Sequence, residues 1–360
     1  MTVSQMRITI LGILLVLVGI SALTCSGQTA DEPWLDSPQP VRATVLATVI
    51  GEPLQALIDA PGQIVDLGGQ TYTAFDIVFQ TKHSGKIIQN GTIQALPNAN
   101  IGNLKAIQNK WGYPAGEIDL TFRNIRFVGG FNRNDGLQER NEAVTDSLGY
   151  GANIFTTVTY RAGVVAFEDC SFEGCGNSSI AGSFLKLTVK NCRFYRVAKH
   201  CVGSREWGGC TVDIDGMIVS ESGNWIDLHG ATGRLESPDY ATINNVTATD
   251  STGRAKISGG NWSVDGSNWT MTQSNVANLN MWGPFDLARN PRRFHVDGFV
   301  AVNWPTMGFG SLTDTTTSGD IEIKNAYIRN SLSGMKVQQK LSVLDSEFDG
   351  IHHRYRSGAP

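Results

Sequence analysis

The sequence has no run of basic residues and no strong excess of charge of one sign. Its formal net charge is -4, from 29 Lys and Arg against 33 Asp and Glu spread over 360 residues. Domains that bind nucleic acids usually gather Lys and Arg in a run or on one face. The composition therefore predicts no nucleic-acid partner.

Long hydrophobic runs are also absent, apart from Ile8 to Leu23 near the N-terminus. Arg7 precedes this run and Ala22-Leu23-Thr24-Cys25 ends it, which is typical of an export signal. Three interpretations stay open: a lipoprotein signal with a lipid on Cys25, a cleaved secretory signal, or a retained anchor. In each case we expect an exported protein, extracellular, periplasmic or lipid-anchored, that contacts a membrane only through this segment.

The remaining chain shows one change of composition. Residues 31–40, DEPWLDSPQP, combine three prolines with three acids and predict a linker. We therefore expect three segments: an export or lipoprotein signal over 1–25, a linker over 26–50, and one folded domain over 51–360.

A short pattern recurs through that domain: apolar–x–apolar–x–(Asn, Asp or Gly)–x–x–apolar. Copies start at Lys86, Leu120, Val165, Leu187, Val212, Ala241, Trp269, Phe294, Ile321 and Leu341. Alternation of apolar residues predicts short strands, and Asn, Asp or Gly between two such runs predicts a bend. Repeats of roughly 20–30 residues made of strands and bends predict a parallel β-helix, an all-β fold, of about ten coils or more.

Among the six cysteines, Cys175, Cys201 and Cys210 show no metal-site spacing. Cys170 and Cys192 hold the same position in successive repeats, beside Ile125 and Met217 in the flanking ones. We expect these two thiols to stack in the core, and a disulfide, which export would permit, is the alternative.

The start of the domain adds a second signature. Residues 52–60, EPLQALIDA, predict a short helix with Leu54, Leu57 and Ile58 on one side, and a strand ending in Gly-x-Tyr72 follows. This entry and the coil repeat resemble the pectate-lyase-like right-handed β-helix superfamily. The resemblance covers about residues 51–360 and implies a single-stranded β-helix whose first coil is capped by the helix.

The resemblance says less about activity, because that superfamily includes lyases, hydrolases, epimerases, tailspikes and adhesins. The Asn-Thr-Asp, Asp-Asp and Gly-His-Gly motifs of polygalacturonases are missing, and so is the Arg-x-Pro-Arg-x-Arg motif of pectate lyases.

The repeat also predicts which side chains share a face. Fourteen residues after the start of a copy we expect inward positions, among them Cys201, Ile226, Ala255 and Gly283, with outward positions on either side. One outer face then gathers ionisable and aromatic residues: His200, Trp225, Asp227, His229, Arg254, Lys256, Trp282 and Asp286.

This set of residues suits chemistry on a uronate-containing polysaccharide. Arg254 and Lys256 are expected to bind the uronate carboxylate. His229 is expected to act as the general base or acid, and Asp227 either orients His229 or acts as a second acid. The substrate-binding residues are expected to be His200, Trp225, Trp282 and Asp286. Residues 224–229, NWIDLH, also loosely resemble a Tyr-Gly-Phe-Asp-Pro-His segment of alginate C5-epimerases.

We therefore expect a lyase or an epimerase, with a glycoside hydrolase built on Asp227 and Asp286 ranked lower. A non-catalytic glycan binder, adhesin, tailspike-like or structural β-helix is the alternative from another class. No cofactor is expected. A calcium ion at Asp213 and Asp215 is conceivable but has no further support, and a homo-oligomer is compatible with the sequence.

Overall fold

A computed structural model describes fifteen segments of the chain: residues 52–74, 77–95, 102–104, 118–129, 155–175, 178–197, 199–204, 209–229, 238–251, 255–258, 262–274, 285–287, 291–304, 320–330 and 341–350. All of them belong to one compact unit, residues 48–360. The signal and linker predicted before residue 51 lie outside the described residues. Among the described residues, no helix has the length and hydropathy needed to span a membrane.

Helix α1 (Glu52–Asp59) precedes the first strand, as expected for a cap on the coil. Leu54 and Ile58 are buried, and α1 packs against β2 (Thr71–Ala74) and β3 (Ile77–Phe79). Leu57, which we predicted on the same side, is 37% exposed, so that part of the prediction is wrong.

Lys86 on β4 (Lys86–Ala95) forms hydrogen bonds with the backbone just after the C-terminal end of helix α1. Its Nζ donates to the backbone oxygens of Ala60 and Gly62, at 2.8 and 2.7 Å. Carbonyls at a helix C-terminus lack partners within the helix, so a cation there stabilises it. The short 3-10 helix η1 (Thr81–His83) lies next to this contact, and its His83 approaches Asp59 at 2.7 Å.

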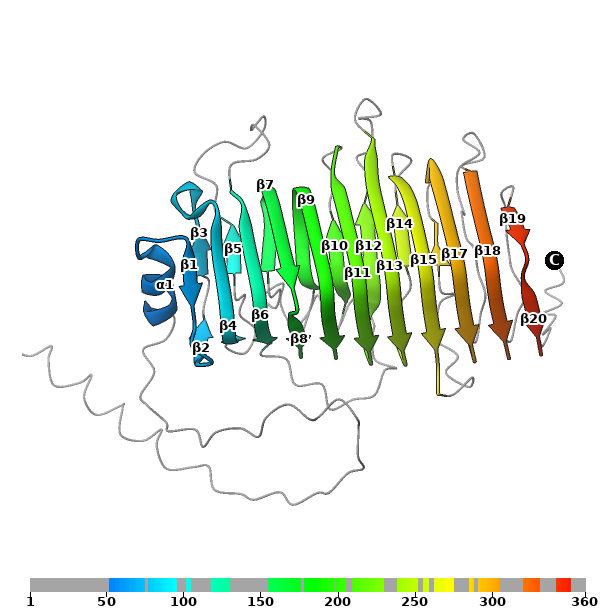
Figure 1. Ribbon diagram of the computed structural model, residues 1–360, viewed down its shortest axis with the longest axis horizontal. Coiled ribbons are helices and arrows are strands. Elements are labelled where there is room, and N and C mark those ends of the chain that lie inside the picture. The colour runs from blue at the N-terminus through cyan, green and yellow to red at the C-terminus, as the bar shows by residue number, and fades with distance from the viewer. Residues whose placement is uncertain are drawn as a thin grey trace, which may run out of the picture. The chain divides into compact units, whose positions relative to one another are not determined.

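The longer strands stack as one continuous row (Figure 1). They are β4 (Lys86–Ala95), β6 (Leu120–Val128), β7 (Phe155–Glu168), β9 (Ser178–Tyr195), β11 (Thr211–Ser220), β13 (Asp239–Thr249), β15 (Trp262–Thr272), β17 (Arg293–Val302) and β18 (Asp320–Arg329). At the two ends of this row, and within it, lie the short strands β1 (Ile64–Asp66), β2, β8 (Ser171–Glu173), β19 (Leu341–Leu344) and β20 (Glu347–Asp349).

A second row of short strands lies behind the first in Figure 1. It comprises β3, β5 (Gly102–Leu104), β10 (His200–Ser204), β12 (Asn224–His229), β14 (Ala255–Ser258) and β16 (Phe285–Asp286), joined through the first parts of β7 and β9. Every strand pair in the described residues is parallel. The prediction of a parallel β-helix is confirmed.

The predicted bends occur where the sequence places Asn, Asp or Gly. Asn124, Asn191 and Asn245 have φ of 50°, 51° and 55°, a left-handed conformation that Asn tolerates better than most residues. Their side chains hydrogen-bond from coil to coil. Asn245 Nδ2 donates to Asp215 Oδ1 at 2.7 Å, and Asn268 Nδ2 donates to Asn245 Oδ1 at 3.1 Å.

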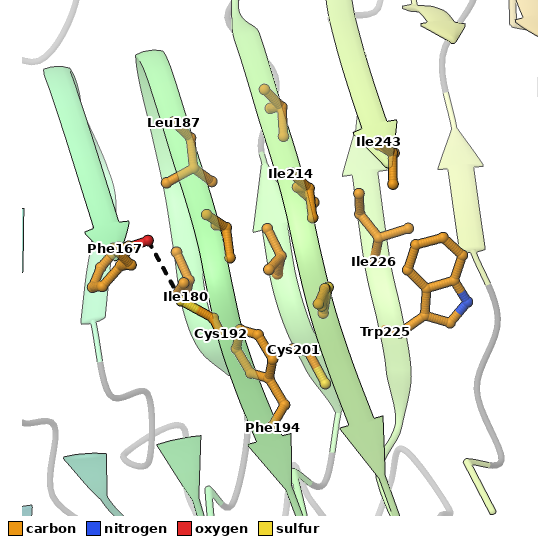
Figure 2. Packing of buried hydrophobic residues seen from close by; sticks show 14 of the residues in the cluster. Phe167, Ile180, Leu187, Cys192, Phe194, Cys201, Ile214, Trp225, Ile226 and Ile243 are labelled. Carbon is orange, nitrogen blue, oxygen red and sulfur yellow. Dashed lines mark hydrogen bonds between the residues drawn. The ribbon is translucent and has the colours of Figure 1, made fainter. Parts of the chain in front are cut away.

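The core fills the inside of the coils with one contiguous apolar cluster (Figure 2). Cys192 pairs with Met217, as the repeat predicted. Cys170 and Cys192 are thiols whose Sγ atoms donate to the backbone oxygens of Phe122 and Phe167, both at 3.4 Å. Contact with Cys170 and burial raise the pKa of the Cys192 thiol well above its usual range. The thiol stack, rather than the disulfide, is therefore the arrangement in this fold.

The carboxylates suggested for calcium are already engaged with protein groups. Asp213 Oδ2 lies 2.7 Å from Lys186 Nζ, and Asp215 accepts the hydrogen bond from Asn245. Within the described residues no group of three His, Cys, Asp or Glu side chains is arranged to hold a metal ion.

Candidate functional site

Strands β10, β12 and β14 lie side by side and carry the described part of the predicted site. Their register pairs His200 with Asn224, and Asp227 with Lys256. Adjacent parallel strands are about 4.8 Å apart, so side chains at paired positions on one face come within reach of each other. The expected neighbourhood of Asp227 and Lys256 is confirmed.

Asp227 lies between two imidazoles. His200 Nε2 is 3.1 Å from its Oδ2, and His229 Nε2 is 2.9 Å from its Oδ1. The side chain of Asp227 is 2% exposed, that of His200 9% and that of His229 34%. One carboxylate thus joins a buried imidazole to an imidazole that reaches solvent.

Both histidine contacts of the Asp227 carboxylate are close nitrogen–oxygen approaches, at 3.1 Å to Oδ2 and 2.9 Å to Oδ1. Among the described residues Oδ1 has no hydrogen-bond partner of good geometry, so its contact with His229 is not an aligned hydrogen bond. The His229 side chain is 34% exposed, so it is the histidine of the group that a ligand in solvent can reach.

Burial and charge act against each other at Asp227. Burial raises the pKa of its carboxyl, but His200, His229 and Lys256 together lower that pKa by more than burial raises it. The result is a pKa of about 2. Burial lowers the pKa of His200 to about 4, although the Asp227 charge acts in the opposite direction. Near neutral pH the buried pair is therefore an ionised carboxylate and a neutral imidazole.

Asn224 completes the group and was given no role in the sequence prediction. Its Nδ2 lies 3.3 Å from His200 Nδ1, on the side of the ring away from Asp227. The signal that would have found it is its register position opposite His200, which the fourteen-residue count missed.

Trp225 is not the outward aromatic platform that we predicted. It is fully buried, and its ring meets the ring of Trp269 edge-on with centroids 5.1 Å apart. Figure 2 shows Trp225 and Ile226 together among the core residues. A large apolar ring gains more by burial than by lying on an open strand, so this position fills the core instead of binding a sugar.

The prediction that His200 lies on an open face is also wrong, because only 9% of its side chain is exposed. Asp286 is paired with Lys256 in the backbone register, two positions from the place we predicted for it, beside Ser258. Arg254 and Trp282 lie outside the described residues.

The arrangement offers a proton-transfer group next to a cation. The imidazole of His229 is a side chain that can act as a general base, and the Asp227 carboxylate beside it would stabilise the charged ring that results. Lys256, half-buried on the adjacent coil, supplies a positive charge close enough to lower the pKa of Asp227. A ligand with an acidic group and a weakly acidic C–H bond matches this combination.

Comparison with known proteins gives a likeness in fold only. No protein-family model and no curated protein matches the sequence. The catalytic domain of a GH87 α-1,3-glucanase, solved in complex with nigerose, is similar with a TM-score of 0.51 and 14% identity, over 92% of this chain and 68% of that one. A family 28 exopolygalacturonase from Yersinia enterocolitica gives a TM-score of 0.39 and 11% identity, over 84% of this chain and 75% of that one. The described chain therefore has a right-handed parallel β-helix fold, which it shares with that glucanase domain.

Proposed function

We propose that this protein acts on a uronate-containing polysaccharide, as a lyase or a C5-epimerase. The observation that carries the proposal is the buried Asp227 carboxylate in contact with the partly exposed His229, with Lys256 on the adjacent coil. The likeness in fold to a polysaccharide-degrading glucanase domain is consistent with a glycan ligand. Export through residues 1–25 is part of the same proposal.

Each group has a defined part in the reaction. The ammonium of Lys256 binds the uronate carboxylate and neutralises its charge, which makes the C5 proton more acidic. His229 removes that proton, and its own positive charge is stabilised by Asp227. In a lyase the electron pair then forms the C4–C5 double bond, the bond from C4 to the 4-linked sugar breaks, and the leaving oxygen takes a proton from water. In an epimerase a proton from water returns to C5 from the other face.

Arg254, Trp282 and Asp286 keep their predicted parts within this proposal. Arg254 would add a second cation for the carboxylate, and Trp282 would offer a ring face to a sugar. Asp286, whose backbone lies beside Lys256, would orient the polymer.

A hydrolase is less well supported by the same site. Glycoside hydrolases need a carboxylic acid that stays protonated near neutral pH to donate to the leaving oxygen. The pKa of Asp227 is about 2, and its side chain is 2% exposed. Asp227 is therefore suited to hold His229 in place and unsuited to donate a proton to a glycosidic oxygen.

The test is turnover of a panel of polyuronates, including alginate, pectate and glycosaminoglycans. The purified protein should produce an unsaturated uronate, seen by its ultraviolet absorbance, from one class of polymer. We expect His229→Ala to abolish the signal and Lys256→Ala to reduce it at polymer concentrations below saturation. The matched controls are His295→Ala and Lys324→Ala, which remove a histidine and a lysine from other strands. Binding of a polymer without turnover or epimerisation would favour the non-catalytic glycan binder.

A further inference from the structure

His200 has no part in the proton removal described above, yet it is the most enclosed histidine of the site. Its side chain is 9% exposed, and its two ring nitrogens face two different partners, Asn224 and Asp227. An imidazole and a carboxylate both lose hydration when they are buried, which costs free energy unless their polar atoms are paired. Two polar residues, Asn224 and His200, thus occupy paired positions at which apolar side chains would be buried with a smaller loss of hydration free energy.

The partners decide which nitrogen of His200 carries the proton. The Asn224 amide nitrogen, at 3.3 Å from Nδ1, can only donate a hydrogen bond, so Nδ1 must accept. A neutral imidazole with an accepting Nδ1 carries its hydrogen on Nε2. That N–H faces Asp227 Oδ2 at 3.1 Å.

The charges around the ring favour the same state. Lys199, Lys256 and His229 all oppose a positive charge on His200, whereas Asp227 favours it. A neutral ring suits both contacts at once: Nδ1 accepts from Asn224, and the hydrogen on Nε2 lies on the side of Asp227 Oδ2, which is 3.1 Å from Nε2. A doubly protonated ring would set an N–H against the Asn224 amide, donor to donor.

We propose that Asn224 and His200 are positioning residues, which fix the Asp227 carboxylate through a single imidazole tautomer so that Oδ1 faces His229. The chain of contacts runs from Asn224 Nδ2 to His200 Nδ1, from His200 Nε2 to Asp227 Oδ2, and from Asp227 Oδ1 to His229 Nε2. The catalytic meaning of this chain rests on the proposed function, whereas the tautomer and its effect on His229 do not.

The molecule contains a matched surface version of the same contacts. His295 Nδ1 accepts from Arg293 Nε at 3.1 Å, and its Nε2 lies 2.8 Å from Asp320 Oδ2. The Asp320 side chain is 70% exposed, whereas that of Asp227 is 2% exposed. Arg293→Ala therefore removes the Nδ1 partner of a histidine at a solvated site and serves as the control.

The experiment is nitrogen NMR of the histidine rings in the full chain, which distinguishes the two neutral tautomers from the charged ring. At neutral pH we expect His200 in the Nε2–H form. Asn224→Asp has nearly the same shape but replaces the donor by an acceptor, so His200 should shift to an Nδ1–H or a charged ring. The resonances of His229 should shift as well, because the contact of His200 Nε2 with Asp227 Oδ2 changes. Arg293→Ala should leave both rings unaltered.

Two further variants keep the test decisive. Asn224→Ala removes the donor without adding a charge, in case the aspartate variant does not fold. His200→Gln retains a side-chain N–H, so we expect Asp227 to keep most of its orientation in this variant. Once turnover is detected, we expect Asn224→Asp to lower kcat about 10- to 100-fold with a smaller change in KM, the range usual for residues that orient a catalytic group.

The positioning role is overturned if His200 is in the Nδ1–H form in the unaltered protein. It is also overturned if the Asn224 variants leave the resonances of His229 unchanged. If the tautomer is as stated and no polyuronate is turned over or epimerised, the proposed function fails while the positioning role stands. The two claims are thus tested by separate readouts.

Discussion

Two histidine–aspartate contacts on this β-helix are nearly equal in length and differ in how deeply the aspartate is buried. His229 lies 2.9 Å from Asp227 on β12, and His295 lies 2.8 Å from Asp320 across β17 and β18. The Asp227 side chain is 2% exposed and the Asp320 side chain 70%. Distance alone would make them equivalent.

Burial separates the two contacts. An exposed ion pair is screened by water and contributes roughly 0–1 kcal/mol. A buried carboxylate loses its hydration and must be compensated by close partners, which here are His200, His229 and Lys256. A contact that keeps two histidines and a lysine around one buried charge is a stronger candidate for function than a surface pair of the same length.

Replacing the two aspartates should give the largest difference. We expect Asp227→Asn to lower kcat on polyuronate by roughly 10²- to 10⁴-fold, since the orienting negative charge beside His229 is lost. Asp320→Asn should leave kcat unchanged. Urea unfolding of Asp227→Ala should show a loss of about 1–3 kcal/mol, because the buried His200 loses its carboxylate partner. Equal effects of the two asparagine variants on kcat would contradict the distinction.

The pH dependence of stability should separate the sites next. The pKa of His200 is about 4 in the folded protein, below its ordinary value of 6.5, so between these values the unfolded chain binds a proton that the folded chain does not. Stability is therefore expected to fall as pH drops from about 6.5 to 4, by on the order of 2–3 kcal/mol.

Asp227 extends the same trend. Its pKa of about 2 lies below the ordinary 3.8, so its stabilisation is present above about pH 4 and is lost as pH falls toward 2. Urea unfolding as a function of pH measures both ranges. His200→Gln should remove the part between pH 6.5 and 4, while His295→Gln should keep it. An unchanged profile in His200→Gln would refute the assignment.

Removal of the cation should have a moderate effect that appears in binding. Lys256→Ala is expected to raise KM for polyuronate about 10- to 100-fold, because a charge-assisted hydrogen bond to the carboxylate is lost. Lys324→Ala, which breaks the surface contact with Glu322, should not change KM. The dependence of KM on salt should weaken in the first variant only. Similar KM values for both variants would argue against a carboxylate site at Lys256.

We expect the smallest effect from substituting Trp225, which is buried in the core next to the site. Trp225→Phe keeps an aromatic ring against Trp269 and removes an indole N–H that has no hydrogen-bond partner among the described residues. We expect a change in unfolding free energy below about 1.5 kcal/mol and no change in KM. A large rise in KM would show that Trp225 contacts the polymer after all, as the sequence had suggested.

The repeat allowed the fold and part of the register to be predicted from the sequence. Alternating apolar residues and left-handed asparagines recur in each coil, and such local signals are readable without neighbours. The pairing of Cys192 with Met217 and of Asp227 with Lys256 followed from that periodicity.

The register failed where the local signal was weak. All five residues of β10 are buried, so no alternation marks its inward face, and Val202 rather than Cys201 pairs with Ile226. In β15 the repeat begins at Val264, which pairs with Ala241 and Phe294, and not at Trp269. A constant count across bends of unequal length carried both errors into the predicted positions of His200 and Asp286.

The chemistry of the site was the least predictable part. The sequence placed Asp227 and His229 together but gave no sign that Asp227 is buried, because burial depends on what covers the strand. It also gave no sign that the amide nitrogen of Asn224 contacts a ring nitrogen of His200. Those contacts depend on one register step between β10 and β12.

The most direct test of the account is proton NMR of a polyuronate in D₂O with the unaltered protein, His229→Ala and His295→Ala. The account predicts a vinyl proton of an unsaturated uronate or deuterium at C5 with the unaltered protein and His295→Ala, and neither with His229→Ala. New reducing ends without either signal would show hydrolysis and contradict proton removal by His229.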